Sequence, residues 1–324
     1  MKKILWFVST LLMAVCLFFS AAGAGDRIFF GIATGGTGGT YYPLGGVLAQ
    51  IISDKVVVDG NKLFATAETG NASVANAMLL SRNGIESAFV AADILDAAYK
   101  GTKQFDGKSL KNLRALGALY PETVQVVVRA TAGVKTIFDL KGKSISSGSP
   151  GSGQWQLLGD LLGAYGMDRK TDIKEDYSSF AQSVEKIRDG DLDASLITAG
   201  TPTASVLELA NHHNIMILPL SGAPIKALQA VQPYYSSIIL PARTYTGQTE
   251  DVETIAVRAI WATHDKLDNT LAYNVVKALY ENTDALSRWH VKGKEISLAK
   301  ALESVSIPLH PGAEKYYREK GLIK

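Results

Sequence analysis

The sequence predicts an α/β protein of two domains, in which sheets are flanked by helices. The chain has 324 residues, and a single hydrophobic core rarely grows much beyond about 250 residues before a chain divides into domains. Hydrophobic residues make up 47% of it and there are only 10 prolines, a composition typical of a folded chain. Short β-rich apolar runs alternate with helical stretches, which is the order found in α/β sheets with helices on both faces.

The first 24 residues have the layout of a secretory signal peptide. Lys2 and Lys3 precede an uncharged and mostly apolar run over residues 4–19, and Ala22 and Ala24 fit an A-x-A-like cleavage site. This run is shorter than the roughly 20 residues that cross a bilayer. We therefore expect cleavage after Ala24 and a mature protein in the periplasm.

Charge and cysteine content exclude several classes of protein. Removal of the signal peptide removes the only cysteine, which excludes disulfide and thiol chemistry. It also removes two of the 33 basic residues, so that 31 remain against 31 acidic residues. This balance argues against a nucleic-acid partner, which requires clustered basic charge.

The expected elements follow the alternation of β-rich runs and helical periodicity along the chain. Pro121 and Glu122 interrupt one apolar stretch, so we expect two strands there, and the type of residues 253–263 stays open. The expected strands are residues 27–33, 62–66, 86–90, 113–119, 124–129, 143–147, 173–177, 194–198, 215–218 and 236–240, and the expected helices are residues 42–53, 71–81, a stretch ending at Tyr99, 152–165, 180–188, 202–210, 271–282 and 298–304.

Two glycine-rich loops favour ligand binding. Residues 34–43 read TGGTGGTYYP and residues 146–153 read SSGSPGSG, and each loop follows an expected strand and precedes a helix. Ligands of open α/β sheets bind beyond the carboxyl ends of strands. Glycine allows a close approach of the backbone, and a helix N-terminus offers unpaired N–H groups to a carboxylate or phosphate. One such loop in each domain favours a ligand site over tight turns alone.

Neither loop fits a nucleotide-binding motif. Tyr41 stands where the dinucleotide fingerprint needs its third glycine. Gln154 and Trp155 stand where a phosphate-binding loop needs Lys and Ser or Thr.

Catalytic and metal motifs are missing from the sequence. The histidines form no H-x-x-x-H pair, and there is no G-x-S-x-G motif. We therefore expect no catalytic residue, no metal and no cofactor. A serine triad is spatial and does not show in sequence, so hydrolysis stays a minor alternative.

Several polar and aromatic residues have two interpretations each. Asp93 follows a strand, where it either caps a helix or contacts a ligand. Glu122 lies either in a solvated turn or at the ligand, and either carboxylate is able to hold an ammonium group if it faces the cleft. Tyr41 and Tyr42 line a pocket or pack in the core. Residues 69–73 combine helix capping with possible ligand contact.

Four motifs resemble the TAXI family, the extracytoplasmic solute receptors of TRAP transporters. They are TGGTGGTYYPLG at residues 34–45, ETGNAS at 68–73, LYPE at 119–122 and GSPGSG at 148–153. The resemblance covers essentially the whole mature chain. It implies a two-lobed, type II periplasmic-binding-protein fold with a mixed sheet in each lobe and a ligand cleft between the lobes.

The resemblance also implies a function. We expect a monomeric, non-enzymatic receptor that binds a small carboxylate or amino acid (glutamate, glutamine or 2-oxoglutarate-like) and delivers it to the membrane permease subunits. An enzyme or a surface adhesin on the same scaffold is the alternative. Two positions depart from the family pattern: Ala91 occupies a site where Gln is frequent, and Gln154 follows the second glycine loop where Thr is usual.

The same resemblance implies the lobes and the site. Lobe one is expected to contain residues 25–119 and 221–324, and lobe two residues 120–220, with hinge crossings near 120 and 220. The loop at 149–153 is expected to hold a carboxylate from one side, and the loop at 34–42 to contact the ligand from the other. The expected ligand-binding residues are Thr34, Gly36, Thr37, Thr40, Tyr41, Tyr42, Thr69, Asn71, Ser73, Asp93, Tyr120, Glu122, Ser149, Gly151, Ser152, Gly153 and Gly200.

Overall fold

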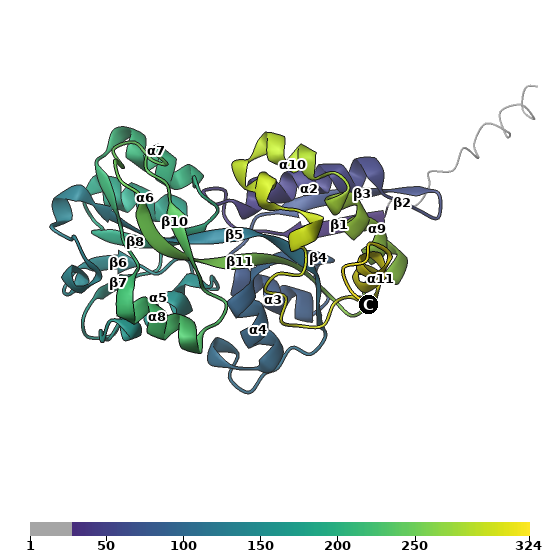
Figure 1. Ribbon diagram of the computed structural model, residues 1–324, viewed down its shortest axis with the longest axis horizontal. Coiled ribbons are helices and arrows are strands. Elements are labelled where there is room, and N and C mark those ends of the chain that lie inside the picture. The colour runs from purple at the N-terminus through teal and green to yellow at the C-terminus, as the bar shows by residue number, and fades with distance from the viewer. Residues whose placement is uncertain (1–27) are drawn as a thin grey trace, which may run out of the picture.

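The fold is a two-lobed α/β structure built on one mixed sheet (Figure 1). The computed structural model describes residues 28–324, and the predicted signal peptide lies outside them. Within this range the strands are β1 (Ile28–Ala33), β2 (Val57–Val58), β3 (Asn61–Glu68), β4 (Ser87–Ala91), β5 (Leu113–Arg129), β6 (Ser144–Ser146), β7 (Lys174–Asp176), β8 (Ala194–Ala199), β9 (Ile215–Leu218), β10 (Ser236–Leu240) and β11 (Val252–His264).

Helices gather at the two ends of this sheet, as Figure 1 shows. We call these ends the α2 end, with β1–β4, and the α5 end, with β6–β10. The α2 end carries α2 (Tyr41–Lys55), α3 (Ser73–Ser81), α4 (Ala92–Lys100), α9 (Asn269–Tyr280), α10 (Thr283–Trp289) and α11 (Pro311–Glu319), and the α5 end carries α5 (Gln154–Ala164), α6 (Phe180–Asp189), α7 (Ala204–His212) and α8 (Gly222–Val231).

Strand order positions the glycine loops. Residues 28–324 form an 11-stranded sheet in the order β2-β3-β1-β4-β11-β5-β8-β6-β7, with β10 paired to β11 and β9 to β5. At the α2 end β1 runs parallel to β3 and β4, and at the α5 end β6 runs parallel to β7 and β8. The carboxyl ends of β1 and β6 therefore each open into a loop that starts a helix.

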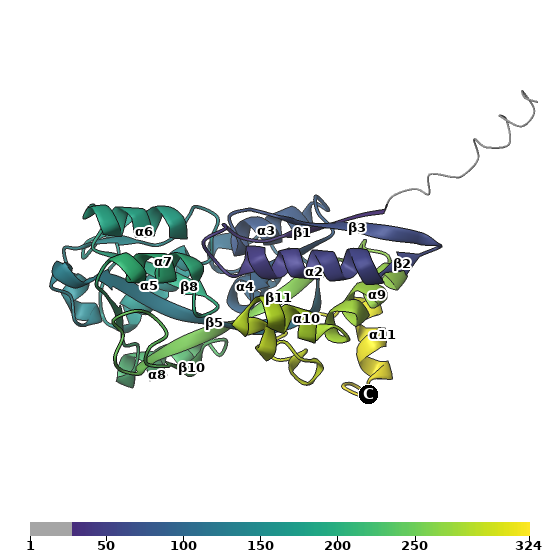
Figure 2. The ribbon, with the colours of Figure 1, turned by 90° about the horizontal axis from the view of Figure 1, so that it is seen from above.

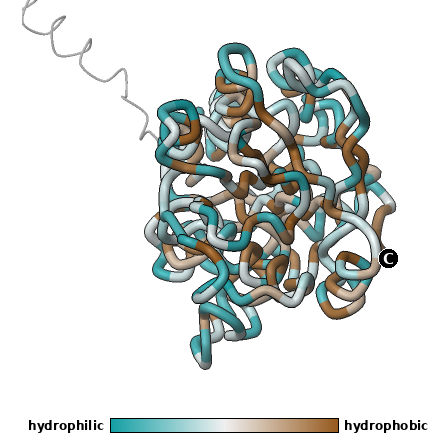
Figure 3. Tube along the Cα trace, turned by 90° about the vertical axis from the view of Figure 1, so that its left-hand side faces the viewer, coloured by the Kyte–Doolittle hydropathy of each residue, from teal (hydrophilic) through white to brown (hydrophobic). Residues whose placement is uncertain are grey.

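The cores lie between the sheet and the helices that cover it. Leu44, Leu48 and Ile52 point inward from α2, where the spacing of four residues puts them on one helix face. Val206 and Leu209 do the same from α7 at the α5 end. Hydrophobic stretches run through the interior of the trace and hydrophilic ones through its outer loops (Figure 3). Among residues 28–324 no helix is long and apolar enough to cross a bilayer.

Two long strands connect the ends of the molecule. β5 has 17 residues and β11 has 13, and both run through the middle of the molecule between the helix groups (Figure 2). They pair antiparallel, with register shifts between Arg258 and Ile260 and between Trp261 and Ala262. The expected break at Pro121 is wrong, because this proline lies inside β5 opposite Arg258, next to such an irregularity, where a missing N–H is tolerated.

Other differences from the predicted elements have tertiary causes. Residues 253–263, whose type the sequence left open, belong to β11. The expected helix at 298–304 is wrong: only a short 3-10 turn, Leu298–Lys300, forms there. Ala301 after it is fully buried and its carbonyl accepts a hydrogen bond from the N–H of Ala118 in β5, at 2.7 Å. The segment is held against the sheet by this bond. β2, α8, α10 and α11 were not anticipated.

Candidate functional site

A cavity of about 210 Å³ lies between the two ends of the molecule. Both glycine loops contribute to its wall, together with the first turns of helices from each end. Its lining residues are Gly35, Gly36, Thr37, Gly38, Gly39, Thr40, Tyr41, Gly70, Asn71, Ala72, Ser73, Ala91, Asp93, Glu122, Ser149, Ser152, Gly153, Gln154, Leu157, Ser179, Phe180, Ala181, Thr198, Ala199 and Val257.

Helix N-termini converge on this cavity. The first residues of α2, α3, α4 and α5 are not capped by any side chain, and residues at each of these termini line the cavity. The first N–H groups of a helix have no partner within the helix and carry a partial positive charge. These termini therefore suit the negatively charged part of a ligand.

Glu122 is a buried carboxyl group in the cavity wall. It belongs to β5, it is 5% exposed, and its Oε2 accepts a hydrogen bond from the Tyr41 hydroxyl at 2.8 Å. Burial raises the pKa of Glu122 to about 8, an effect that the Tyr41 hydrogen bond opposes and nearby Asp93 reinforces. Burial and the Glu122 charge raise the pKa of Tyr41 as well. Glu122 is therefore mainly protonated at neutral pH in these surroundings.

Asp93 is a second buried carboxyl group in the same wall. It lies in the first turn of α4, is 5% exposed, and accepts a hydrogen bond at Oδ2 from the Tyr235 hydroxyl, at 2.8 Å. Its Oδ1 is buried and has no hydrogen-bond partner. Burial raises the pKa of Asp93, whereas the Tyr235 hydrogen bond lowers it.

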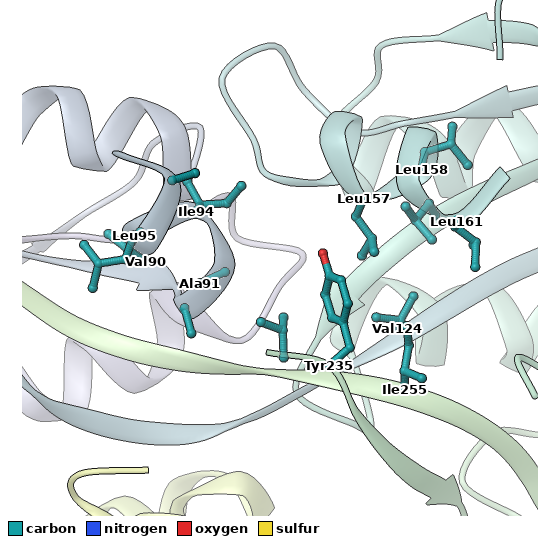
Figure 4. Close-up of a cluster of buried hydrophobic side chains, with 14 of the residues drawn as sticks. Val90, Ala91, Ile94, Leu95, Val124, Leu157, Leu158, Leu161, Tyr235 and Ile255 are labelled. Atoms are coloured by element: carbon teal, nitrogen blue, oxygen red, sulfur yellow. The ribbon is translucent and has the colours of Figure 1, made fainter. Parts of the chain in front are cut away.

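Tyr235, which donates this hydrogen bond to Asp93, lies between the two ends of the molecule. It precedes β10, and in Figure 4 its ring stands between Ala91 and Ile94 on one side and Leu157 on the other. The ring is 3% exposed and belongs to the same hydrophobic cluster as those residues. The hydroxyl that reaches Asp93 is thus held by apolar packing from both ends.

The remaining polar lining is neutral. Ser152 Oγ, Gln154 Oε1 and Thr198 Oγ1 are buried without a hydrogen-bond partner, and all three residues line the cavity. The lining contains no Lys, Arg or His. Within residues 28–324 no cluster of three or more His, Cys, Asp or Glu side chains is arranged to hold a metal ion.

Direct contacts join the two ends around the cavity. The Thr40 hydroxyl donates to the carbonyl of Gly200 at 3.0 Å, and the N–H of Ser205 donates to the carbonyl of Gly38 at 3.2 Å. On the opposite side, α3 bonds to the second glycine loop through Ala75 N–H and the Gly151 carbonyl, at 3.0 Å. Both glycine loops are therefore hydrogen-bonded to the opposite end of the molecule.

Most of the residues predicted from sequence to bind ligand lie in this wall. The lining contains Gly36, Thr37, Thr40, Tyr41, Asn71, Ser73, Asp93, Glu122, Ser149, Ser152 and Gly153. Ala91 and Gln154, the two departures from the TAXI pattern, lie in it as well.

The other six predicted residues lie outside the lining. The Thr34 hydroxyl donates a hydrogen bond to the carbonyl of Glu68, at 2.7 Å, and Tyr42 is 37% exposed. Gly151 lines a separate groove on the other side of its loop. Thr69, Tyr120 and Gly200 also lie outside, with Tyr120 fully buried and Gly200 bonded to Thr40.

Sequence reasoning missed part of the wall at the α5 end. Ser179, Phe180 and Ala181 line the cavity at the start of α6, where Ser179 and Gln182 form a capping box. That box, S-x-x-Q after a strand, is a signal that sequence reading is able to find. Thr198, Ala199 and Val257 carry no comparable local signal.

Comparisons with known proteins agree with the fold. A family model described as the NMT1-like family matches residues 32–321. The alkanesulfonate-binding protein SsuA from Xanthomonas axonopodis pv. citri bound to MOPS is 17% identical, with 92% of this chain and 85% of that chain covered and a TM-score of 0.51.

Two further solved structures have the same fold. A protein from Bordetella bronchiseptica RB50 is 17% identical, with 90% and 89% of the two chains covered and a TM-score of 0.50. A Streptococcus mutans structure, reported with glutathione import via GshT and the cystine ABC importer TcyBC, is 15% identical, with 84% and 96% covered and a TM-score of 0.50.

Proposed function

Because the chain belongs to the NMT1-like family and has the fold of a periplasmic solute-binding protein, we propose that it is an extracytoplasmic solute receptor. It binds a small carboxylate or amino acid in the cavity between its lobes and delivers it to a membrane transporter. It performs no chemistry on the solute.

The observation that carries this proposal is the cavity with its unpaired polar groups. Leaving a buried polar group without a partner costs about 1–3 kcal/mol, and such groups are uncommon in native structures. Asp93, Ser152 and Thr198 each have one such atom and all line this cavity. A bound solute that supplies their partners stabilises the closed form over the open one, which is how a hinged receptor signals occupancy.

The transporter class is proposed from the sequence motifs. Residues 34–45, 68–73 and 148–153 resemble TAXI receptors, and each of these segments contributes to the lining. We therefore propose TRAP permease subunits as the membrane partner, a periplasmic location and a monomeric receptor. An enzyme on the same scaffold is the second candidate, but no observation in the cavity favours it.

The lobes are proposed to meet in the middle of β5 and β11. The first crossing, near residue 120, keeps its predicted place. We propose that the second crossing lies in β11 and not near residue 220. The reason is that α8 packs on α5 and β10 pairs with residues 252–256. Residues up to about 256 would then move with lobe two. Limited proteolysis with and without solute tests this division through the protection of residues 221–256.

Native mass spectrometry of the purified mature protein tests the function. We expect one small molecule per chain, unchanged on release, and one-to-one binding when it is added back in a calorimetric titration. The triple variant Ser149→Ala, Ser152→Ala, Tyr41→Ala should lose this binding. Thr246→Ala is the matched control: Thr246 is exposed and does not line the cavity, so this variant should bind as the parent does. A purified protein that converts its solute would support the enzyme instead.

A further inference from the structure

We propose that the solute is a zwitterion of net charge zero, whose protonated amine lies between Glu122 and Asp93 and whose single carboxylate lies at the N-terminus of α5. This inference rests on the proposed receptor function and narrows it. It selects amino compounds with a neutral side chain and excludes dicarboxylates, including the 2-oxoglutarate-like and glutamate-like ligands that the sequence motifs imply.

The amine position follows from the two buried carboxyl groups. Glu122 comes from β5 and Asp93 from α4, each is 5% exposed, and both line one cavity. Each receives one hydrogen bond from a tyrosine, which leaves Asp93 Oδ1 without a partner. Burial disfavours ionisation of both acids in the absence of a counter-charge, and an ammonium group with three donors is the ligand group that allows both to ionise.

The titratable side chains around these two groups supply no such cation. Tyr41 and Tyr120 face Glu122. Asp93 is faced by Tyr234, by Tyr235 and by Lys103 with its partner Asp160. Lys103 is already paired with Asp160 at 2.9 Å and does not line the cavity.

The carboxylate position follows from the opposite wall. The N-terminus of α5 has no side-chain cap, and Ser152 Oγ beside it is buried and unpaired. Gly153 brings the backbone close to the cavity, and a Cβ there would lie 2.9 Å from Ile94 Cγ1. Backbone N–H groups with an adjacent hydroxyl form a binding site for one carboxylate.

A second carboxylate has no place in this cavity. Of the other helix N-termini at the cavity, α4 already carries Asp93 in its first turn, the N–H of Ala75 at the start of α3 donates to the Gly151 carbonyl, and Pro43 in the first turn of α2 has no N–H. The partial charge of the α5 terminus falls off within its first turn, and no Lys, Arg or His is among the lining residues. Leu157, Phe180 and Val257 make up apolar parts of the wall. A second negative charge would lie against these side chains or against the two acids, and both arrangements are unfavourable.

The proposal predicts whether protons are released or taken up when the solute binds, and therefore how affinity changes with pH. Glu122 is mainly protonated at neutral pH without an ammonium group beside it, since its pKa lies at about 8. An ammonium group beside it lowers this pKa and releases the proton. Amine affinity should therefore rise as pH increases from about 6 to 8. A dicarboxylate would have the opposite effect, since it takes up a proton at Glu122 and binds more weakly as pH rises.

Calorimetric titrations with matched probes test the charge requirement. L-Glutamine and L-glutamate differ by one charge at nearly constant size, and L-glutamate and 2-oxoglutarate differ by the amine. L-Leucine and 4-methyl-2-oxopentanoate repeat the amine comparison on an apolar skeleton. We expect L-glutamine to bind at least tenfold more tightly than L-glutamate, and each amino acid to bind at least tenfold more tightly than its keto acid. Tighter binding of L-glutamate than of L-glutamine, or of either keto acid than of its amino acid, would overturn the inference.

Variants assign the amine to its residues. Glu122→Gln and Asp93→Asn each keep an acceptor for the neighbouring tyrosine but remove the charge, and each should weaken zwitterion binding about tenfold or more. Glu122→Gln should also abolish proton release, measured by titration in buffers of different ionisation enthalpy. The control is Glu319→Gln, because this exposed carboxylate also accepts a tyrosine hydrogen bond, from Tyr273 at 2.6 Å, outside the cavity. Unchanged affinity and proton release in Glu122→Gln and Asp93→Asn would contradict the assignment.

The solutes that the protein captures from a metabolite mixture distinguish a failure of the zwitterion inference from a failure of the proposed receptor function. Recovery of an amine with one carboxylate supports the inference, and recovery of a dicarboxylate overturns it while leaving the receptor function intact. A protein that captures no solute and binds none of the probes would overturn the receptor function, and the inference with it.

Discussion

The Tyr41 hydroxyl donates to Oε2 of Glu122 over 2.8 Å, which joins the first turn of α2 to the strand that runs between the two ends of the molecule. These residues are 81 positions apart in sequence and both are buried. The bond connects the first glycine loop, which ends at Tyr41, with the acid in the wall of the cavity. Changes to either partner should therefore affect both the loop and the titration of the acid.

Tyr41→Phe removes the donor without creating a large void. The hydrogen bond lowers the pKa of Glu122 against the effect of burial, so its loss should move that pKa further upward. Proton release on solute binding should then persist to higher pH. Nuclear magnetic resonance of labelled glutamate carboxyl carbons across a pH series measures the shift. An unchanged midpoint would mean that Tyr41 does not interact with the ionised acid.

The ionisation of Glu122 should make the stability of the solute-free protein depend on pH. Its pKa is about 8 when folded and about 4.3 in an unfolded chain, so between these values the folded state holds the extra proton. The free energy of unfolding should fall as pH rises through this window. This fall in the free energy of unfolding should be on the order of a few kcal/mol and should be absent in Glu122→Gln. Urea denaturation at pH 5 and pH 8.5 measures it. Equal pH dependence in Glu122→Gln and the parent would argue against the shifted titration.

Tyr235→Phe should weaken the contact between the two ends of the molecule. Its hydroxyl is the partner of Asp93 Oδ2, and without it both oxygens of this carboxyl group lack a side-chain partner. We expect a loss of about 1–3 kcal/mol in the free energy of unfolding. Denaturant unfolding measures it, with Tyr99→Phe as the control, since the Tyr99 hydroxyl has no hydrogen-bond partner among residues 28–324. A loss no larger than in the control would show that the Asp93 carboxyl group finds another hydrogen-bond partner.

Gly38→Val should block closure without disturbing either end. A Cβ at Gly38 would lie 3.2 Å from Cβ of Ser205 and 3.4 Å from the backbone nitrogen of Ala181, and both residues belong to the opposite end. Small-angle scattering with saturating solute should show an expanded particle, and affinity should drop about tenfold or more. Gly46→Ala in α2 is the control, since nothing lies within 4 Å of its Cβ position. A compact particle with full affinity would show that this contact does not govern closure.

Local patterns predicted the fold class and much of the cavity wall. The loop at residues 34–43 and the loop at 146–153 were found because glycine, hydroxyl residues and a following helix lie together in sequence. Tyr235 was not found, because nothing local distinguishes a tyrosine that reaches a carboxyl group 142 residues away. The continuity of β5 through Pro121 was missed for a similar reason, since it depends on the irregular pairing with β11.

The pairing of β5 with β11 has a consequence for the order of binding. Residues 252–256 of β11 pair with β10, and residues 259–263 pair with β4, whereas Val257 and Arg258 pair with β5 alone, opposite Glu122 and Pro121. A two-stranded ribbon twists and bends more readily than a wide sheet, so lobe rotation is easiest about this point. With the proposed hinge, Glu122 lies near the axis and is expected to move least when the lobes separate. We therefore expect the open receptor to present this acid already in its final place, so that a solute docks there by its amine before the α5 end closes over its carboxylate.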